Sequence, residues 1–353
     1  MNSLKISNKS IGPRNPVFFI AEAGVNHNGS IVLAKKMVDI AKQAGADAIK
    51  FQSFKTENII LKNAPKSKYH LDTTGSNKKM SWYDLLKTQE MSEKMHFILK
   101  EYCDKKKIIF LSTPYDNDSV DLLTKLKINA FKIASTDNQN YPLLKYIAKK
   151  NKPIILSTAM SNFEEIQKVY NFIKKINKKI IILQCTGNYP SRIEETNLNV
   201  MKTYKKKLKC VVGYSDHTIG NYSAIAATAA GAKVIEKHFT LNKKMFGPDH
   251  RMSMSPKELK SIIKDIRIIE SILGSDVKKI LPSEIENRKK LKKSLVSCKF
   301  IPKGKKLSKK YFKIKRPGTG LSPEKLLNIS NYVSLRDIKA DTTIKKKMIR
   351  KIK

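Results

Sequence analysis

The feature that most constrains this chain is a short apolar run followed by a helical pattern, which recurs eight times within about 250 residues. Each run has the length and residue types of a buried strand. Eight strand–helix alternations match an α/β fold of the (β/α)8 TIM barrel type better than an open doubly wound sheet. The first run also lacks the GxGxxG fingerprint of a dinucleotide-binding sheet. The predicted strands are Val17–Ala21, Ala46–Phe51, Ile108–Leu111, Ala130–Ile133, Ile154–Leu156, Ile180–Leu183, Cys210–Gly213 and Lys233–Ile235.

The last helix of the predicted barrel is marked at both ends. Ser255 and Glu258 form a capping box around Pro256 at the first helical position, and Gly274 ends the helix. We therefore place the barrel in residues 1–274. The stripe that we expect to face inward is Leu259, Ile262, Ile263, Ile266 and Leu273.

The C-terminal part of the chain has a different pattern. Residues 275–293 are rich in Lys and Glu with little apolar periodicity, which indicates a linker. Short strand-like segments broken by Pro and Gly predict a small, mostly β domain over 294–353, which is marginal alone and should dock on something. Its most distinctive element is the loop KRPGTG, which presents Arg316. The predicted strands are Ser294–Ile301, Lys310–Ile314 and Val333–Leu335.

The net charge of +41 raises the question of a nucleic-acid partner. The excess is nearly all Lys, is spread along the helices, and accompanies many Ile and Asn residues, so solvated lysine faces explain it more simply. No recognition-helix, zinc-finger or RNP-like pattern is present. We therefore expect no nucleic-acid partner, although the charge can help to attract an anionic substrate.

The cysteines and the hydropathy pattern bear on the compartment. The four cysteines form no CxxC pair, which suggests reduced thiols. No apolar run has the length of a signal peptide or of a membrane span. We expect a cytoplasmic protein with no membrane contact.

Polar residues follow every predicted strand. The carboxyl ends of barrel strands meet at one rim, where active sites are built. One Ser-Thr pair after a strand is usually a helix cap, but eight successive polar ends are hard to assign to capping alone. These residues include Glu22, Asn26, His27, Lys50, Gln52, Ser112, Thr113, Lys132, Ser135, Ser157, Thr158, Cys185, Thr186, Ser215, Asp216, His217, Glu236, Lys237 and His238.

The rim is rich in cations and hydroxyls of the kind that hold phosphate or carboxylate. Buried lysines are costly without a partner, so inward-pointing lysines imply an anionic ligand or paired carboxylates. Glu22 and Asp249 are candidate acid–base groups or hydroxyl acceptors, although a surface or supporting carboxylate is the simpler interpretation of each alone. The predicted cation–hydroxyl set is Lys50, Lys132, Ser112, Thr113, Ser135, Ser157 and Thr158.

Two histidines follow neighbouring predicted strands in the segment from Val211 to His250. His217 and His238 would lie at the same ends of two parallel strands. Two imidazoles with an open third position suit a catalytic divalent metal better than a closed structural one. Spacing alone leaves two interpretations open, metal ligation and histidines that are satisfied at strand ends.

The chain resembles the sialic acid synthases, the nonulosonate synthases that condense phosphoenolpyruvate with an N-acylated hexosamine. The resemblance implies a (β/α)8 barrel, a C-terminal antifreeze-like (SAF) domain and a domain-swapped homodimer. GYSDHT with EKHFT and a trailing KRPGxG is the most specific combination. In order from Phe18 to Gly320, the matching segments are AEAGVNHNG, KFQSFKTENI, FLSTPYD, FKIAS, IILSTAM, GYSDHT, EKHFTL, GPDH and KRPGTG.

The resemblance also implies roles for single residues. His217 and His238 match the ligands of a divalent metal, Mn²⁺ or Mg²⁺, and with Glu22 they form the implied catalytic set. Arg316 matches the residue that the SAF domain of one subunit inserts into the barrel of its partner. The implied phosphoenolpyruvate ligands are Lys50, Thr113, Lys132, Ser135, Ser157 and Ser215. The implied amino-sugar ligands are Glu22, Gln52, Asn77, Asp137, Tyr189, Asp249 and Arg316.

The implied reaction joins phosphoenolpyruvate to N-acetylmannosamine and gives N-acetylneuraminate (sialic acid) and phosphate. Two departures touch the sugar side. Asp137 stands where the family commonly has Glu, and Gly187 stands where Asn or Thr is common. A 2,4-diacetamido hexose leading to N,N'-diacetyllegionaminate is therefore the alternative, whereas FGPDH argues against the pseudaminate branch. A more distant alternative is a basic nucleic-acid- or surface-binding protein on a degenerate barrel, which predicts salt-sensitive binding and indifference to His217→Ala.

Overall fold

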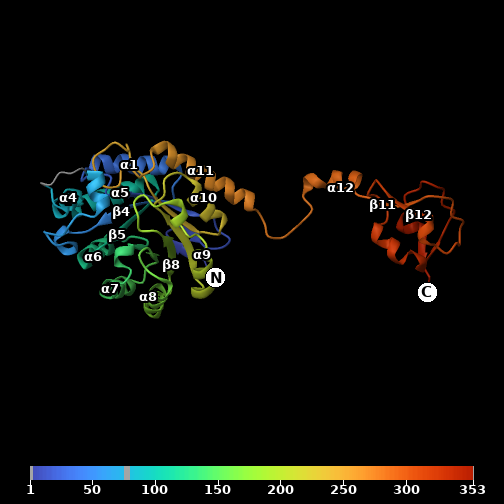
Figure 1. Ribbon diagram of the computed structural model, residues 1–353, viewed down its shortest axis with the longest axis horizontal. Coiled ribbons are helices and arrows are strands. Elements are labelled where there is room, and N and C mark those ends of the chain that lie inside the picture. The colour runs from blue at the N-terminus through green and yellow to red at the C-terminus, as the bar shows by residue number, and fades with distance from the viewer. Residues whose placement is uncertain (1–2, 75–79, 353) are drawn as a thin grey trace. The chain divides into compact units, whose positions relative to one another are not determined.

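Eight parallel strands form the centre of the first of two units, which confirms the predicted (β/α)8 barrel. The computed structural model describes residues 3–74 and 80–352 and divides the chain into units 1–274 and 275–353 (Figure 1). The strand order is β5-β4-β3-β10-β9-β8-β7-β6, and β5 and β6 lie next to each other where the barrel nearly closes. The bounds are β3 Phe18–Gly24, β4 Ala48–Ser53, β5 Ile109–Pro114, β6 Phe131–Ile133, β7 Ile154–Ser157, β8 Ile180–Cys185, β9 Val211–Asp216 and β10 Val234–His238.

Helices cover the outside of the barrel (Figure 1). The first helix shows how the sequence sets its ends, because the Ser30 side chain accepts the Leu33 N–H and Gly45 closes the helix at φ +89°. Three short helices, α2 to α4, form an excursion between β4 and β5. The bounds are α1 Ile31–Ala44, α2 Thr56–Ile59, α3 Lys68–Thr74, α4 Trp82–Gln89, α5 Glu93–Lys106, α6 Asn117–Lys125, α7 Tyr141–Lys149, α8 Phe163–Ile176, α9 Val200–Leu208, α10 Tyr222–Ala229 and α11 Pro256–Leu273.

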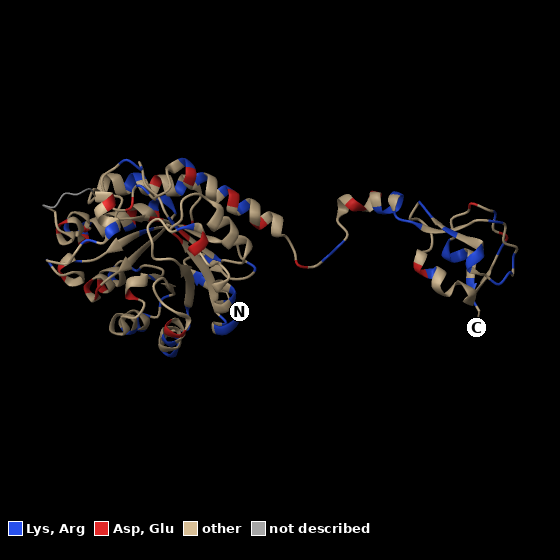
Figure 2. Ribbon diagram, viewed as in Figure 1, with Lys and Arg blue, Asp and Glu red and all other residues tan. Residues whose placement is uncertain are grey.

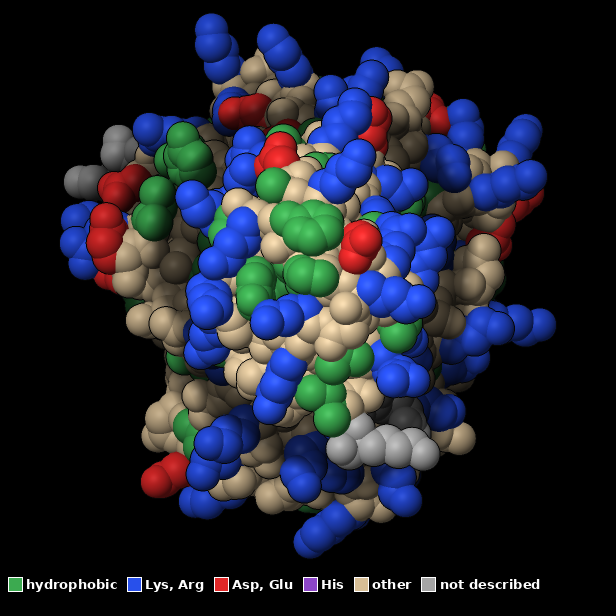
Figure 3. Space-filling model, turned by 90° about the vertical axis from the view of Figure 1, so that its right-hand side faces the viewer, with side chains coloured by type: hydrophobic (Ala, Val, Ile, Leu, Met, Phe, Trp, Pro, Cys, Tyr) green, Lys and Arg blue, Asp and Glu red, His purple; other side chains and the backbone are tan. Residues whose placement is uncertain are grey.

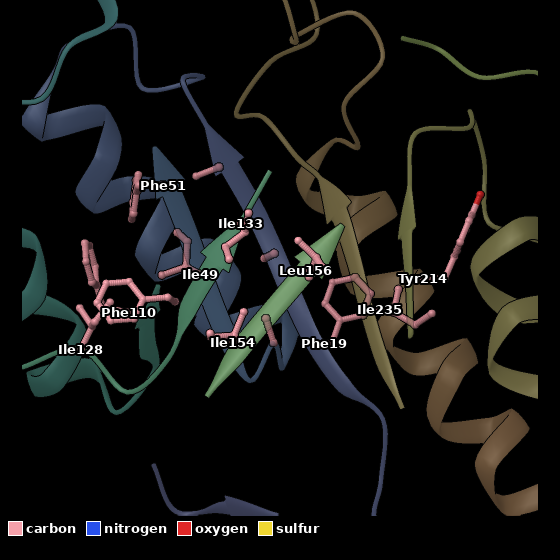
Figure 4. Packing of buried hydrophobic residues seen from close by; sticks show 14 of the residues in the cluster. Phe19, Ile49, Phe51, Phe110, Ile128, Ile133, Ile154, Leu156, Tyr214 and Ile235 are labelled. Carbon is pink, nitrogen blue, oxygen red and sulfur yellow. The ribbon is translucent and has the colours of Figure 1, made fainter. Parts of the chain in front are cut away.

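The barrel has two apolar layers because strand side chains alternate between its faces. Phe19, Ile49 and Ile235 belong to the outer layer, between strands and helices (Figure 4). Phe18 and Ile20 belong to the inner layer, which also includes Ile155, Ile181, Val211 and Val234. A hairpin of β1 (Leu4–Ile6) and β2 (Lys9–Ile11), which the strand pattern does not predict, adds the fully buried Ile6 and Ile11 to this inner layer.

Helix α11 confirms its predicted caps and most of its buried stripe. The capping box of Ser255 and Glu258 forms, and Gly274 follows the last helical residue. Leu259, Ile262, Ile263 and Ile266 are buried, but the prediction for Leu273 is wrong, because this residue is 53% exposed. It is the last residue of α11, and the first unit ends one residue later, at Gly274.

Among its described residues, the second unit has a small apolar core, two antiparallel strand pairs and three isolated antiparallel bridges. The predicted strands correspond to β11 (Ser294–Ser297), β12 (Phe312–Lys315) and β13 (Tyr332–Ser334), and a further strand, β14 (Ile349–Lys351), is not among the predicted ones. Its core residues are Leu295, Ile301, Leu307, Phe312, Ile329, Ile338, Ile344, Met348 and Ile349.

Part of the predicted linker is helical. Helix α12 (Ile285–Leu291) belongs to the second unit and packs on the KRPGTG loop, where the Gly318 N–H donates to the Lys289 carbonyl at 2.8 Å. A side chain at 318 would meet the Arg288 carbonyl at 2.8 Å, so only glycine allows this approach. Composition alone therefore did not reveal α12, because the loop that it packs on lies about 30 residues further along the chain.

Lys, Arg, Asp and Glu residues are distributed along the ribbons of both units (Figure 2). The face shown in Figure 3 has many Lys and Arg side chains around a small group of hydrophobic ones. This spread agrees with the solvated lysine faces that the sequence indicates. No helix in the described part of the chain combines the length and apolar content that a membrane crossing requires.

Candidate active site

A cavity of about 650 Å³ lies at the carboxyl ends of the strands, and side chains at the ends of all eight strands line it. This is the rim that the sequence analysis singles out. The cavity brings together every described barrel residue to which the family resemblance gives a catalytic or ligand-binding role. These are Glu22, Lys50, Gln52, Thr113, Lys132, Ser135, Asp137, Ser157, Tyr189, Ser215, His217, His238 and Asp249.

Two predicted site residues are not among these. Asn77 lies outside the described residues. Arg316 belongs to the second unit, where it is exposed and its Nε donates to the Leu291 carbonyl at 3.1 Å.

Two members of the predicted cation–hydroxyl set do not line the cavity, so their assignment to a ligand was wrong. Ser112 lies on the outer face of β5, and its Oγ is 2.6 Å from the Ser53 Oγ. Thr158 donates to the Leu183 carbonyl at 2.8 Å. Both follow a strand in sequence, but alternation along the backbone turns their side chains away from the cavity.

Two buried lysines form the polar floor of the cavity. The Lys50 Nζ is 2.9 Å from Glu22 Oε2 and from Thr113 Oγ1, and 3.9 Å from Glu236 Oε2. The Lys132 Nζ is 3.3 Å from Glu236 Oε1. Each lysine is 3% exposed. Both cations therefore face the cavity already paired with carboxylates, which is one of the two arrangements predicted for buried lysines.

Glu236 is the charged residue that the site prediction missed. It accepts a hydrogen bond from Ser215 Oγ at 3.0 Å and lies between the two lysines. Burial acts to raise its pKa, but Lys132 and Lys50 outweigh burial and hold the pKa below its usual range. Period-two alternation was the available signal, because Glu236 precedes His238 by two residues and must share its face of β10.

Glu22 has a protonation state that is suited to proton transfer near neutral pH. Burial raises the pKa of Glu22 to about 7, and the attraction of Lys50 opposes that rise only in part. Burial also favours the neutral form of Lys132 and therefore lowers its pKa. A carboxyl group with a pKa near 7 can accept or donate a proton at the pH of most cells.

The two histidine rings lie close together at the mouth, with their planes inclined by 58°. Their ring centroids are 5.6 Å apart. The His217 Nδ1 is 2.7 Å from the Thr186 carbonyl, which leaves Nε2 free of that contact. The His238 Nδ1 is buried, has no hydrogen-bond partner among the described residues, and lies 3.8 Å from Asp249 Oδ2.

These residues fit a divalent metal with open coordination positions. Burial and the neighbouring His217 keep the pKa of His238 well below its usual value, so this ring is neutral as a ligand must be. Burial is outweighed at His217 by Cys185 and the Thr186 carbonyl, which raise its pKa to about 9, so metal binding there would displace a proton. No group of three or more His, Cys, Asp and Glu side chains that could hold a metal ion occurs in residues 3–74 and 80–352.

The groups of the floor and of the mouth meet around Gly24. This residue has φ +53°, and a side-chain carbon placed on it would lie 3.4 Å from Glu22 Oε1, 3.5 Å from His238 Cε1 and 3.6 Å from Asp249 Oδ2. Glycine therefore keeps open the space into which these three side chains project. Glu22 connects the lysine floor to the histidine pair.

Aromatic and apolar side chains form the remaining wall. The Tyr69 hydroxyl donates to Asp249 Oδ1 at 3.1 Å and to the Pro248 carbonyl, and the Tyr189 ring lies 4.1 Å from the His217 ring. Tyr189 was expected from the family resemblance, whereas Tyr69 and the apolar members were not, because the segment with helices α2 to α4 lies outside the repeated strand-end pattern. The apolar members of this wall are Phe54, Ile59, Ile60, Trp82, Leu85 and Leu86.

Comparison with known proteins agrees with this geometry. A model of the NeuB family matches residues 37–278, and a model of the SAF domain matches residues 292–350. The N,N'-diacetyllegionaminic acid synthase of Campylobacter jejuni is 45% identical over 329 residues, which cover 92% of this chain and 98% of that protein. The N-acetylneuraminate-9-phosphate synthase of Homo sapiens is 34% identical over 345 residues, which cover 96% and 94%. The crystal structure of the N-acetylneuraminic acid synthetase of Leptospira borgpetersenii has a TM-score of 0.72 and 35% identity, and the match covers 81% of this chain and 95% of that one.

Proposed function

Because the chain belongs to the NeuB family of nonulosonic acid synthases, we propose that it condenses phosphoenolpyruvate with an N-acylated hexosamine and releases phosphate. The observation that carries the proposal is the floor of the cavity. Lys50 and Lys132, each 3% exposed, converge there with the hydroxyls of Thr113 and Ser215. A phosphate and a carboxylate on one small molecule match two buried cations ringed by hydroxyl donors.

The chemistry follows from this placement. Lys50 and Lys132, with the neighbouring hydroxyls, hold the phosphate and carboxylate of phosphoenolpyruvate, so that its carbon 3 points toward the mouth. Carbon 3 attacks the aldehyde carbon of the open-chain sugar and a C–C bond forms, while the aldehyde C=O π bond opens, its oxygen takes up a proton, and carbon 2 becomes electron-deficient. Water adds to carbon 2 with loss of a proton, and the C–O bond to phosphate then breaks. Holding both reactants in one cavity supplies much of the rate increase.

The residues at the mouth handle the sugar and its protons. Glu22, with its pKa raised by burial to about 7, lies where floor and mouth meet and serves as the group that exchanges a proton with the reacting oxygens. Asp249 and Gln52 accept and donate hydrogen bonds to sugar hydroxyls. His217 and His238 would hold a divalent metal, Mn²⁺ or Mg²⁺, which supplies Lewis-acid polarisation of the aldehyde oxygen.

The wall of the cavity bears on the choice of sugar. N-acetylmannosamine, which would give N-acetylneuraminate, presents hydroxyls at most positions. A 2,4-diacetamido hexose presents a second acetyl methyl group, and the apolar wall that includes Phe54, Trp82 and Leu85 would bury it favourably. The 45% identity with a protein named N,N'-diacetyllegionaminic acid synthase supports the same choice. We therefore rank the diacetamido hexose first and N-acetylmannosamine second.

A panel of hexosamines tests the reaction and the sugar together. Phosphate release from phosphoenolpyruvate is measured with Mn²⁺ present, and the product mass is determined for each sugar. We expect kcat/KM for the 2,4-diacetamido hexose to exceed that for N-acetylmannosamine by at least about tenfold, the value of one buried apolar group. A higher value for N-acetylmannosamine would reverse the ranking. Folded protein that releases no phosphate with any hexosamine would overturn the proposed reaction.

We further propose that two copies of the chain complete each other's sites, with Arg316 of one copy entering the cavity of the other. The segments that follow the barrel strands expose large apolar side chains around the mouth: Val32, Met160, Ile193, Ile219, Tyr222 and Phe246. The second unit exposes Phe300 and Leu327 together with Arg316. Apolar surfaces on both units favour an obligate contact, and a second copy of the SAF domain is the occupant that also brings a cation.

Mixed dimers test this arrangement. His217→Ala and Arg316→Ala chains are each expected to be inactive, and refolding them together should restore activity, because one site in the mixed dimer receives an intact barrel from one chain and Arg316 from the other. Each chain mixed with itself is the matched control. Light scattering gives the mass. A monomeric wild-type protein, or a mixture without restored activity, would contradict the proposal.

A further inference from the structure

An ion pair lies directly behind the two histidines. Asp216 and Lys237 are paired across β9 and β10 in the parallel register, each one residue before a histidine. Because strand side chains alternate, His217 and His238 face the cavity while Asp216 and Lys237 face the opposite side. The Lys237 Nζ is 2.6 Å from Asp216 Oδ2.

The pair is buried and fully hydrogen-bonded. Asp216 is 1% exposed and Lys237 is 2% exposed. Asp216 Oδ1 accepts hydrogen bonds from the Thr218 N–H at 2.9 Å and from the Thr218 hydroxyl at 2.8 Å. The Lys237 Nζ donates to the Thr218 carbonyl at 2.6 Å. Buried charges with this many partners hold a fixed geometry, because losing one partner leaves the other uncompensated.

These hydrogen bonds hold the chain on both sides of His217. The residue before it and the residue after it, Asp216 and Thr218, both bind Lys237, which itself precedes His238. The ring of His217 is held separately by the Thr186 carbonyl at 2.7 Å. One buried cluster, Asp216–Thr218–Lys237, therefore joins the backbone on both sides of His217 to the residue before His238, and none of its three residues lines the cavity.

We propose that the Asp216–Thr218–Lys237 cluster is a positioning element that sets the spacing of His217 and His238 for a divalent cation. This inference rests on the proposed metal dependence. Groups behind metal ligands fix the orientation of those ligands, and losing one typically lowers metal affinity by about 10- to 100-fold. Asp216 and Lys237 are positioning residues here, because they act through the histidines.

The test measures Mn²⁺ binding to metal-free, full-length protein by electron paramagnetic resonance, without substrates. We expect Asp216→Asn and Lys237→Met to weaken Mn²⁺ binding by about 10- to 100-fold at temperatures where both proteins are folded. His217→Ala and His238→Ala define the site and should abolish saturable binding. Thr218→Val, which keeps both charges and removes one hydroxyl donor, should weaken binding by about three- to tenfold.

Asp47→Asn is the matched control for a purely structural role. Asp47 lies just before β4 at the opposite end of the barrel, where it accepts the Phe19 N–H at 2.9 Å and pairs with Arg267 at 3.2 Å. It is therefore also a carboxylate that joins a backbone N–H to a cation. We expect Asp47→Asn to lower the melting temperature while the Kd for Mn²⁺ stays within about twofold of wild type.

The outcomes separate the two proposals. Wild-type protein without saturable Mn²⁺ binding would overturn the proposed metal dependence and this inference with it. Wild-type binding that Asp216→Asn weakens no more than Asp47→Asn does would overturn this inference alone. If Asp216→Asn and Lys237→Met do not fold, Thr218→Val decides, and an unchanged Kd in that variant would show that the cluster contributes to stability only.

Discussion

The two ends of the barrel are built from the same strands but bury opposite kinds of side chain. At the amino ends, the inner layer is apolar and the β1–β2 hairpin adds Ile6 and Ile11 to it. At the carboxyl ends, the inner side chains are Glu22, Lys50 and Glu236, each at most 5% exposed. Burying charge costs free energy even when the charges are paired. The apolar amino ends therefore contribute stability that offsets the cost of the charged site at the carboxyl ends.

The change happens within single strands. Along the inward face of β4, Ala48 is followed by Lys50 and Gln52, and along β10, Val234 is followed by Glu236 and His238. Two residues therefore separate a side chain that stabilises the barrel from one that we expect to bind or react. Substitutions at the two ends should consequently have opposite signatures in activity and in stability.

The largest expected effect on activity is at the floor of the cavity. Lys132→Met removes one of two buried cations, and we expect kcat/KM for phosphoenolpyruvate to fall on the order of 10³-fold, about 4 kcal/mol. Steady-state phosphate release measures it. The double variant Lys132→Met/Glu236→Gln removes the partner carboxylate as well, and should recover thermal stability without recovering activity. Recovered activity in the double variant would mean that charge balance alone, not anion binding, requires Lys132.

The opposite signature is expected at the amino ends. Ile6→Ala leaves a cavity in the inner layer, and we expect the free energy of unfolding to fall by about 3 kcal/mol, because Ile6 is fully buried. Urea denaturation measures it, with Ile268→Ala, an exposed isoleucine, as the control. Below the transition, kcat/KM should stay within about twofold of wild type. A large loss of activity in folded Ile6→Ala protein would contradict the division between the two ends.

The protonation of Glu22 gives the carboxyl ends of the barrel a pH-dependent stability. Burial raises the pKa of Glu22 from 4.5 to about 7. The folded state therefore holds a proton that the unfolded state releases, and stability from this group is lost as pH rises from 4.5 through 7. Between pH 5 and pH 8, we expect Glu22→Gln to gain roughly 2 kcal/mol relative to wild type. Melting curves across this range measure it, and a constant difference between the two proteins would contradict the assignment.

Structural features that repeat along the chain were predicted from the sequence, whereas several features that occur only once were missed. The barrel, the helix caps and the polar rim follow from a pattern with eight copies, and the family resemblance is confirmed by the NeuB and SAF matches. Ser112 and Thr158 were misassigned because all polar residues at a strand end were expected to face the cavity. Backbone alternation instead places neighbouring side chains on opposite faces of the strand. The same alternation, applied to His238, would have given Glu236, which the sequence already places at the rim, a position in the site.

Tertiary contacts that no local period encodes account for the rest. Tyr69 reaches Asp249 across 180 positions of the chain, and helix α12 forms in a lysine-rich stretch because the loop around Gly318 packs on it. Neither contact leaves a mark in residue spacing. The β1–β2 hairpin was missed for the same reason, since three-residue strands are too short to show a period.

The smallest expected effect concerns an exposed ion pair at the amino ends of the strands, in contrast to the buried ion pairs at the carboxyl ends. Lys9 pairs with Asp47 at 2.8 Å, but the Lys9 side chain is 50% exposed. Water and salt screen such a pair, so we expect Lys9→Ala to change the free energy of unfolding by about 0.5 kcal/mol or less, and by less still in 1 M salt. Activity should not change. A loss of 2 kcal/mol or more would mean that this pair behaves like Lys50 and Glu22, which are 4% and 2% exposed at their side chains, and burial alone would then not distinguish the two ends of the barrel.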